Sequence, residues 1–349
     1  MSVHPRPLLA IFANSIAIIA QVAHDGNMTN THYDAVVLGA GAAGLSAAQA
    51  LGRSLRRTLV IDAGAPRNRF ASHMHNVLGL DGTPPLELVA RGRAEAEVYG
   101  VEFTEGTVSA VTGHGDVTLE LAPDQQGTVR RIETRALIVA TGASDTLPDV
   151  PGLANYWGST VLHCPYCHGW EVRGSRLAVL AASPLALHQA TLIRQWSEHL
   201  TVFSAALGEL APDIARALQV RGTVIEPSPV TEVLGDGARV TGIRTANGAD
   251  HEIDAIFTMG AVTPHDGFLA GLNLARTETP VGDFLTVDPG GRTSHPRIWA
   301  AGNVVNPMAT VPIAMGAGAQ AGGSANYALV ELDVAAALAA DAVRSGGAA

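Results

Sequence analysis

A glycine-rich turn between two apolar segments constrains the fold of this chain more than any other feature. Residues 33–38 form a short apolar run, the turn that follows is Gly-Ala-Gly-Ala-Ala-Gly, and an Ala-rich helix is predicted over residues 45–51. In such a unit Gly39 permits the tight turn, Gly41 lets the backbone approach a pyrophosphate, and Gly44 lets helix and strand pack closely. The pattern therefore predicts a dinucleotide-binding unit.

The next apolar run, residues 59–62, strengthens this prediction because it ends in an acid. Asp62 follows the glycines at a spacing of about 20 residues, where a carboxylate holds the ribose hydroxyls of a dinucleotide. A glycine pattern alone is a weak signal, and a turn without a ligand is the alternative interpretation. The complete strand, turn, helix and acid favour nucleotide binding.

A second unit of the same kind begins at residue 176, but its nucleotide contacts are missing. Its first strand is predicted over residues 177–180, and Ala181, Ser183 and Ala186 stand where the first unit has its three glycines. Ser204 takes the position of the ribose-binding acid, and the alanines that follow it offer no arginine for a 2′-phosphate. The sequence thus predicts a second fold of this type that has lost its nucleotide site.

Two further β-runs, residues 136–143 and 297–303, lie on either side of the second unit, and a helix is predicted from about residue 312 to residue 329. The fold class is therefore α/β, with two Rossmann-like (three-layer ββα) nucleotide-binding domains, the second inserted into the first. We expect the first domain to comprise residues 31–145 and 263–345, and the inserted domain to comprise residues 146–262.

The amino terminus carries an apolar run over residues 8–13 that continues through Ile19. This run is too short to span a bilayer and is closer to the core of a signal peptide, but the cleavage signal is poor. Met28 stands just before the first strand. We expect residues 1–30 to be a dispensable N-terminal extension, with a secretion signal as the alternative.

Composition and charge limit the partners of this chain. Its 349 residues, 47% of them hydrophobic and 15% charged, suffice for two domains with complete cores. The net charge of −10 argues against nucleic acid or an anionic membrane as an electrostatic partner. Two cysteines in a chain of this size indicate a reducing compartment, so we expect a cytoplasmic location.

Those two cysteines, Cys164 and Cys167, form a Cys-x-x-Cys pair flanked by His163 and His168. The spacing brings two sulfurs within bonding reach and lowers the pKa of one thiol, so the pair can cycle between dithiol and disulfide. A zinc site would need both adjacent histidines, which are sterically awkward ligands, so we expect no metal. A purely structural disulfide is a further alternative, although so short a loop removes little entropy from the unfolded chain. A redox-active disulfide is the favoured interpretation.

These motifs, in this order and spacing, resemble those of the low-molecular-weight thioredoxin reductase family over about residues 31–332. They are the glycine turn, Ala140-Thr141-Gly142, Cys164-Pro165-Tyr166-Cys167, and Ala300-Ala301-Gly302-Asn303. The resemblance implies bound FAD, a homodimer, and a disulfide on the inserted domain that faces the flavin. The FAD contacts that it implies are Gly39, Gly41, Ala43, Gly44, Asp62, Asn76, Thr141, Gly142, Gly302, Asn303 and Val311.

Two departures from the reductases define a subtype. The glycine turn and arginines that bind NADPH are missing from the second unit, and His168 stands where the reductases usually carry an acid. Both features are similar to those of the gliotoxin- and holomycin-type dithiol oxidases, which carry a Cys-Pro-aromatic-Cys-His motif. This resemblance implies that electrons pass from a small-molecule dithiol through the disulfide to FAD and then to O2, closing a disulfide in a secondary metabolite and forming H2O2. A smaller departure is Asn303, where the family usually has Asp.

By the same resemblance, Cys164 is attacked by a substrate thiolate and Cys167 is the sulfur on the flavin side. His168 is the candidate acid/base, and His163 is a candidate to stabilise a thiolate as imidazolium. A packing role for either histidine remains open. His73 and His75, on the loop expected to cross the flavin beside Asn76, either face the reaction site or lie on the surface.

Two other functions stay open on the sequence. One is a reductase of a thioredoxin-like protein that uses ferredoxin or an atypical NADPH mode. The other is a non-catalytic flavoprotein that acts as a redox sensor. A protein substrate needs a broad docking face, whereas a small dithiol needs a pocket at Cys164, and the sequence does not distinguish the two.

Overall fold

A computed structural model describes residues 32–123 and 127–346 of the chain. The expected N-terminal extension, with its apolar run, lies outside the described residues. Within the described ranges, none of the helices combines the length and the apolar character that crossing a membrane requires.

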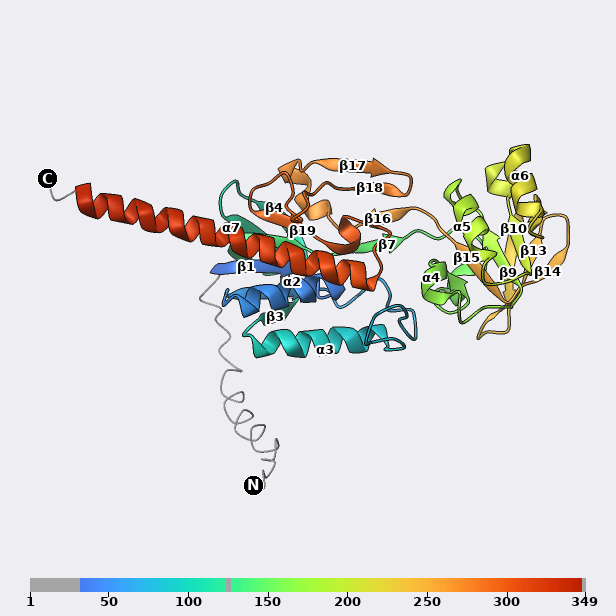
Figure 1. Cartoon of the computed structure of the whole chain (residues 1–349), viewed down its shortest axis with the longest axis horizontal. Coiled ribbons are helices and arrows are strands. Elements are labelled where there is room, and N and C mark those ends of the chain that lie inside the picture. The colour runs from blue at the N-terminus through green and yellow to red at the C-terminus, as the bar shows by residue number, and fades with distance from the viewer. Residues whose placement is uncertain (1–31, 124–126, 347–349) are drawn as a thin grey trace, which may run out of the picture. The chain divides into compact units, whose positions relative to one another are not determined.

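The first sheet has the strand order β3-β2-β1-β6-β5-β4, with β19 paired to β6. Figure 1 labels β1, β3, β4 and β19 of this sheet. Its central strands pair in parallel, whereas β4, β5 and β6 pair antiparallel. The strands are β1 (His32–Leu38), β2 (Thr58–Asp62), β3 (Glu102–Glu105), β4 (Val108–Thr112), β5 (Val117–Leu121), β6 (Arg131–Val139) and β19 (Ile298–Ala300).

Successive residues of β1 point to opposite faces of this sheet, and each face has its own core. Ala35 and Val37 pack with α2 (Ala42–Arg53) and α7 (Val311–Gly346), while Val36 and Leu38 pack with β5 and the η4 turn (Gly267–Leu272). The third helix, α3 (Pro85–Val98), contacts α2. A Cβ at Gly318 would lie 1.9 Å from the carbonyl oxygen of Ala43, so α7 approaches α2 as closely as backbone allows.

Helix α7 is longer than expected, since it ends at Gly346 and not near residue 329. The Ala-rich sequence continues past that point, and alanine is the strongest helix former. Asp333 pairs with Arg56 at 2.8 Å and also with Arg135, which ties this part of the helix to the sheet domain. Residues 334–345 are exposed.

The second sheet has the order β11-β10-β9-β15-β8, and all its pairs are parallel. Helices α5 (Leu185–Ile193) and α6 (Pro212–Gln219) pack on it, and an antiparallel sheet β12-β13-β14 accompanies it. The strands are β8 (Val161–Leu162), β9 (Leu177–Leu180), β10 (Leu200–Phe203), β11 (Val224–Glu226), β12 (Val230–Gly235), β13 (Val240–Thr245), β14 (Asp250–Glu252) and β15 (Ala255–Thr258). The predicted fold class, α/β with two Rossmann-like units, is confirmed.

Strand register confirms the alignment of the two units. Leu38 pairs with Ile61 in the first sheet, and Leu180 pairs with Phe203 in the second, so Asp62 and Ser204 follow equivalent pairs. The N–H of the residue after the first strand donates to the partner strand in both units, at 2.8 Å in the first and 3.1 Å in the second. The second unit therefore keeps the strand register of the first, although Ala181 does not share the positive φ of Gly39.

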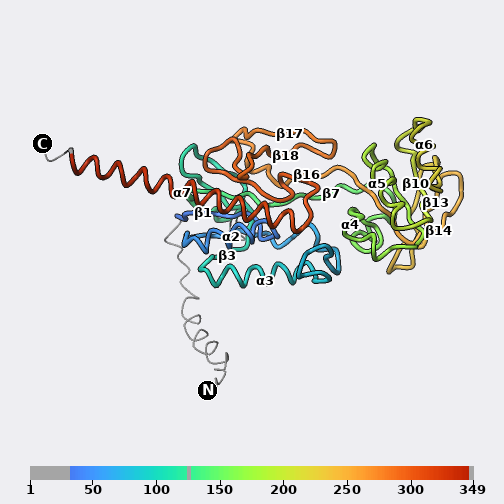
Figure 2. Tube along the Cα trace, in the orientation of Figure 1, coloured from blue at the N-terminus to red at the C-terminus, as the bar shows by residue number. Residues whose placement is uncertain are grey.

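The chain passes between the two sheets twice, through β7 (Ala143–Asp145) and β16 (Val262–Pro264). These strands pair antiparallel, and Figure 2 traces the two passes. His265 fastens them further: its ring contacts the Ser144 hydroxyl at 2.8 Å and the Thr141 carbonyl at 3.2 Å. A short hairpin, β17 (Arg276–Thr279) and β18 (Gly282–Leu285), follows β16.

Candidate active site

One cavity of about 920 Å³ brings the predicted site residues together, and this volume is near the upper end of the range for cofactor sites. The disulfide, both flanking histidines and the first glycine turn all line it. Of the predicted site residues, Gly44 alone is outside the lining. A Cβ there would lie 1.8 Å from the Gly39 carbonyl oxygen, so Gly44 serves the packing of α2 on the turn.

The turn before α2 fits a dinucleotide. Gly39 has a φ of +95°, and a Cβ on it would lie 2.5 Å from the carbonyl oxygen of Ala140, so a side chain is excluded. Gly41 is different, because a Cβ there would meet no atom within 4 Å and would point into open space at the cavity wall. That space, at the amino end of a helix, is suited to a phosphate.

Asp62 is fixed at the carboxyl end of β2. Its carboxylate accepts the backbone N–H of Ala40 at 2.8 Å and that of Gly64 at 3.0 Å. An ionised carboxylate has acceptor capacity beyond two such bonds. The group can therefore hold ribose hydroxyls while it stays bound to the turn.

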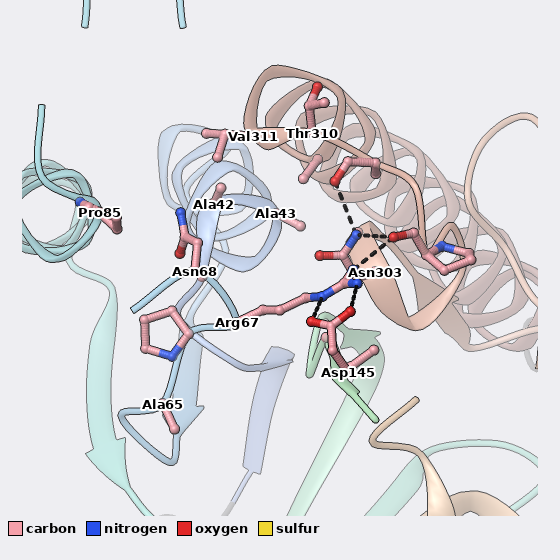
Figure 3. A pocket seen from close by; sticks show the side chains of 18 of the residues that line it. Ala42, Ala43, Ala65, Arg67, Asn68, Pro85, Asp145, Asn303, Thr310 and Val311 are labelled. Atoms are coloured by element: carbon pink, nitrogen blue, oxygen red, sulfur yellow. Dashed lines mark hydrogen bonds and ion pairs between the residues drawn. The ribbon is translucent and has the colours of Figure 1, made fainter. Parts of the chain in front are cut away.

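Asn303 uses its amide nitrogen to hold a loop, so this nitrogen is not available to a ligand. Its Nδ2 donates to the carbonyl oxygens of Asn306 at 3.0 Å, Ala309 at 3.1 Å and Pro307 at 3.4 Å. Figure 3 shows the Asn303 side chain among the residues that line the cavity. The amide oxygen is then the group left to accept a ligand hydroxyl. This loop leads into α7, whose first residue, Val311, also lines the cavity.

Two other predicted contacts carry constraints that the sequence did not reveal. The Thr141 hydroxyl donates to the His265 carbonyl oxygen at 2.6 Å, so it ties the turn at Gly142 to the second crossing strand. Asn76 has a φ of +60°, and its backbone N–H donates to Asp81 at 3.0 Å. Both residues line the cavity.

An ion pair that sequence reasoning missed joins two residues of the cavity lining. Arg67 pairs bidentately with Asp145, and it also donates to the Pro307 carbonyl oxygen at 2.7 Å (Figure 3). The pair joins the loop after β2 to the first crossing strand. Neither residue belongs to a recognisable motif, so the sequence carries no signal for it.

The disulfide joins Cys164, directly before the short helix α4 (Pro165–His168), to Cys167 within that helix, with a Cα–Cα distance of 5.3 Å. Gln189 on α5 donates its amide to the His163 carbonyl oxygen at 2.6 Å and so fixes the chain just before the pair. Among the residues that the structure describes, no group of three or more His, Cys, Asp or Glu is arranged to hold a metal ion.

Burial lowers the pKa of both flanking histidines. For His163, burial is the main cause and the positive charge of Arg67 adds to it, while Asp145 opposes it. For His168, burial is again the main cause, and Glu171 opposes it. Both rings are therefore neutral at neutral pH. A neutral His168 can accept a proton, and a neutral His163 can donate a hydrogen bond to a thiolate.

His73 and His75 both line the cavity but differ in their surroundings. His73 is exposed, whereas the ring of His75 lies between two carboxylates, Asp81 and Glu171, each at 3.4 Å. The sequence gave no sign that Glu171 would meet His75.

A disulfide and a glycine turn on one cavity, in a chain with two dinucleotide folds, define a disulfide oxidoreductase. The chain belongs to the pyridine nucleotide-disulphide oxidoreductase family, whose sequence model matches residues 33–318. Two relatives that are named thioredoxin reductase confirm the resemblance to thioredoxin reductases.

Known relatives support this assignment. The chain is 32% identical to thioredoxin reductase sirT of Leptosphaeria maculans, over 87% of this chain and 96% of that protein. It is 31% identical to thioredoxin reductase tcpT of Claviceps purpurea, over 86% of this chain and 96% of that protein. Among solved structures, HlmI has a TM-score of 0.83 and 38% identity, covering 92% of this chain and 99% of its own.

Proposed function

We propose that this chain is an FAD-dependent dithiol oxidase, which closes a disulfide in a small-molecule dithiol through Cys164 and Cys167, with O2 as electron acceptor and H2O2 as product. One observation carries the proposal. The disulfide shares a cavity with an intact dinucleotide turn, whereas the equivalent turn of the second unit has lost its contacts.

The second unit is a poor nucleotide site for structural reasons as well. Ala181, in the position of Gly39, is buried in the core of the second sheet, and Ser204, in the position of Asp62, is buried too. Leu185, the first residue of α5, packs against a separate apolar cluster that includes Met259 and Phe284. We therefore infer that the electrons enter from a thiol and not from NADPH.

The first unit would hold FAD. Gly41 and the amino end of α2 would face the pyrophosphate, Asp62 the ribose, and Asn303 and Val311 the flavin end. Bound FAD supplies a two-electron acceptor that O2 can reoxidise. The protein groups that line the cavity would hold this cofactor, and they keep the disulfide and the two histidines on the same cavity.

Thiol–disulfide exchange then follows from the two sulfurs. A substrate thiolate attacks Cys164, so a mixed disulfide forms and Cys167 leaves as a thiolate. The second substrate thiolate attacks the substrate sulfur of that mixed disulfide, which releases Cys164 and the closed product. Two electrons have then entered the cysteine pair, and two thiol protons have been removed.

His168 is the base that these exchange steps require. A thiol of ordinary pKa, near ~8.5, is mostly protonated at neutral pH and attacks sulfur only after it loses its proton. Because burial lowers the pKa of His168, its ring is in the accepting form at that pH. His163 would assist by donating a hydrogen bond to the thiolate that leaves.

A second candidate is a protein-disulfide reductase, as the names of sirT and tcpT suggest. One observation favours it: Tyr166 and Trp170 are 64% and 66% exposed beside the disulfide, and exposed aromatic side chains are common in protein docking faces. The proposed homodimer and a cytoplasmic location are compatible with either function.

Anaerobic mixing of the purified FAD-loaded protein separates the candidates. We expect dithiothreitol to bleach the visible flavin absorbance, NADPH to leave it unchanged, and added O2 to restore it with formation of H2O2. Rapid bleaching by NADPH, followed by reduction of an added thioredoxin, would establish the reductase instead. Ala181→Gly with Ser183→Gly serves as a control, because it restores the glycines without the missing charge contacts and should not confer NADPH reduction.

A further inference from the structure

An exposed aromatic ring stands at the cavity between the two cysteines. Tyr166 belongs to helix α4, one residue before Cys167, and it lines the cavity with 64% of its surface exposed. In the exchange steps the sulfurs and histidines of this segment act, whereas this ring has no part in them. A large aromatic side chain that stays exposed at a cavity is a candidate contact for a ligand.

The Tyr166 ring is held in place by Trp196. The two rings meet edge to face, with centroids 5.8 Å apart and an angle of 88° between their planes, which is a favoured geometry for an aromatic pair. Trp196 is itself packed against Gly169, because a Cβ at Gly169 would lie 2.7 Å from two atoms of the Trp196 ring. The Tyr166 ring thus has a supported orientation while most of its surface stays free.

The charged side chains of the cavity wall are already engaged. Histidines aside, the charged residues of the described lining are Asp62, Arg67, Asp145 and Asp266. Asp62 accepts two backbone N–H groups, and Arg67 pairs with Asp145. Asp266 is buried and pairs with Arg276 at 2.9 Å. Because a charge that enters such a site without a partner is costly, the cavity favours an uncharged ligand.

We propose that Tyr166, supported by Trp196, is a specificity-determining residue that contacts an uncharged planar group of the dithiol substrate. This inference rests on the proposed function. Two flat groups stabilise each other in offset or edge-to-face contact, and a ring that is already held in place loses little freedom when a ligand binds. The contact binds the substrate through a part other than its sulfurs, so both thiols stay free for exchange at Cys164.

The test compares small dithiols in two matched pairs. Benzene-1,2-dimethanethiol and butane-1,4-dithiol close disulfide rings of the same size, but only the first carries a planar group. Dihydrolipoamide and dihydrolipoate carry the same two thiols and differ in charge. For each dithiol, kcat and KM are measured by O2 uptake with the FAD-loaded protein. Calorimetry measures how the closed disulfide products bind to the oxidised protein, a readout that needs no turnover.

Four variants separate the ring from its support and from its hydroxyl group. Tyr166→Leu removes the flat ring but keeps an apolar side chain, and Tyr166→Phe keeps the ring. Trp196→Leu removes the support, although Trp196 itself does not line the cavity. Tyr327→Leu is the matched control, because Tyr327 on α7 is 67% exposed and does not line the cavity. FAD content and thermal midpoint are recorded for every variant.

We expect the unmodified protein to favour benzene-1,2-dimethanethiol over butane-1,4-dithiol roughly 2- to 10-fold in kcat/KM, the range for one aromatic contact. Tyr166→Leu should abolish this preference, mainly through KM, and Trp196→Leu should lose part of it. Tyr166→Phe and Tyr327→Leu should retain it. Dihydrolipoamide should be favoured over dihydrolipoate roughly 10-fold or more, because the carboxylate finds no free counter-charge.

Two results would overturn this inference while the proposed function stands. A preference for the planar dithiol that survives in Tyr166→Leu would mean that another part of the cavity selects it. Equal kcat/KM values for dihydrolipoate and dihydrolipoamide would refute the selection of uncharged substrates.

Oxidation of none of the four dithiols by the unmodified protein would instead remove the proposed function. Product binding that is lost in Tyr166→Leu and kept in Tyr166→Phe would then still support the contact at the ring. A Tyr166→Leu variant impaired only in the reduction of thioredoxin by NADPH would assign the ring to a protein docking face and overturn the inference.

Discussion

Replacing Asn303 with the acid that reductases usually carry should damage this protein. In Asn303→Asp the amide nitrogen, which donates to the carbonyl oxygens of Asn306, Pro307 and Ala309, becomes an oxygen that faces them. An amide group has two N–H bonds, so at most two of these contacts are full hydrogen bonds. At about 1 kcal/mol each, their loss costs about 2 kcal/mol, and the carbonyl oxygens left facing a carboxylate raise this to about 2–4 kcal/mol.

The assay is thermal unfolding of the variant, together with the dissociation constant for FAD. A loss of this size should lower the thermal midpoint by about 4 °C or more. FAD binding should weaken too, because the displaced loop leads into Val311 at the cavity. Asn306→Asp is the matched control, since the Asn306 side chain accepts the Met308 N–H at 3.0 Å and a carboxylate keeps that role.

The pH dependence gives this prediction a second readout. The facing carbonyl oxygens raise the pKa of the new carboxyl in the folded state above its ordinary value of about 3.9. The folded state therefore binds the proton more tightly than the unfolded state, and the loss of stability is complete at neutral pH and shrinks as the pH falls toward 4. A variant at neutral pH with the stability and FAD affinity of the unmodified protein would refute the argument that this amide holds the loop.

Further predictions concern the turn, the disulfide and His168. Gly41→Val should fold with normal stability but purify without FAD, because its side chain would fill open space in the cavity. Gly44→Ala should fail to fold, because its Cβ would meet the Gly39 carbonyl oxygen. Circular dichroism measures the folding of both variants, and flavin absorbance measures their FAD content. Cys164→Ser should keep FAD, lose dithiol turnover and show a long-wavelength absorption band from the remaining thiolate; lack of that band would mean that the two sulfurs have the reverse order. His168→Ala should lower turnover by roughly 10²-fold at neutral pH, with the loss shrinking as rising pH supplies thiolate, and an unchanged pH profile would assign the ring to packing.

Sequence reasoning succeeded where position along the chain determines position in space. The residue at the end of the second parallel strand lies beside the first turn of its own unit. Alignment of the two units by sequence therefore assigned Ser204 correctly to the position that Asp62 has in the first unit. Helix α7 shows the limit of the same reasoning, because it was expected to end near residue 329 but continues to Gly346. The continuation combines alanine-rich sequence with ion pairs from Asp333 to two arginines that are distant in the chain.

Contacts between loops that are distant in the chain could not be predicted from the sequence. Glu171 and His75 belong to different units, and nothing in either local pattern requires them to meet. The Arg67–Asp145 pair is missed for the same reason. Asn303 is a different case: its type was noted as a departure, but its three carbonyl partners depend on how the loop after it folds back.

The pairing of β7 with β16 has a consequence for how this chain is assembled. Asp145 pairs with Val262, and the N–H of Thr146 donates to the Ala261 carbonyl oxygen at 2.8 Å, so entry to and exit from the second unit are neighbours across a ladder. Paired strands lie about 4.8 Å apart, a gap that an Asn-Gly turn closes as an ordinary hairpin. The second unit thus takes the place of a hairpin loop, and joining residue 146 directly to residue 261 would leave the segments of the first sheet connected in one chain.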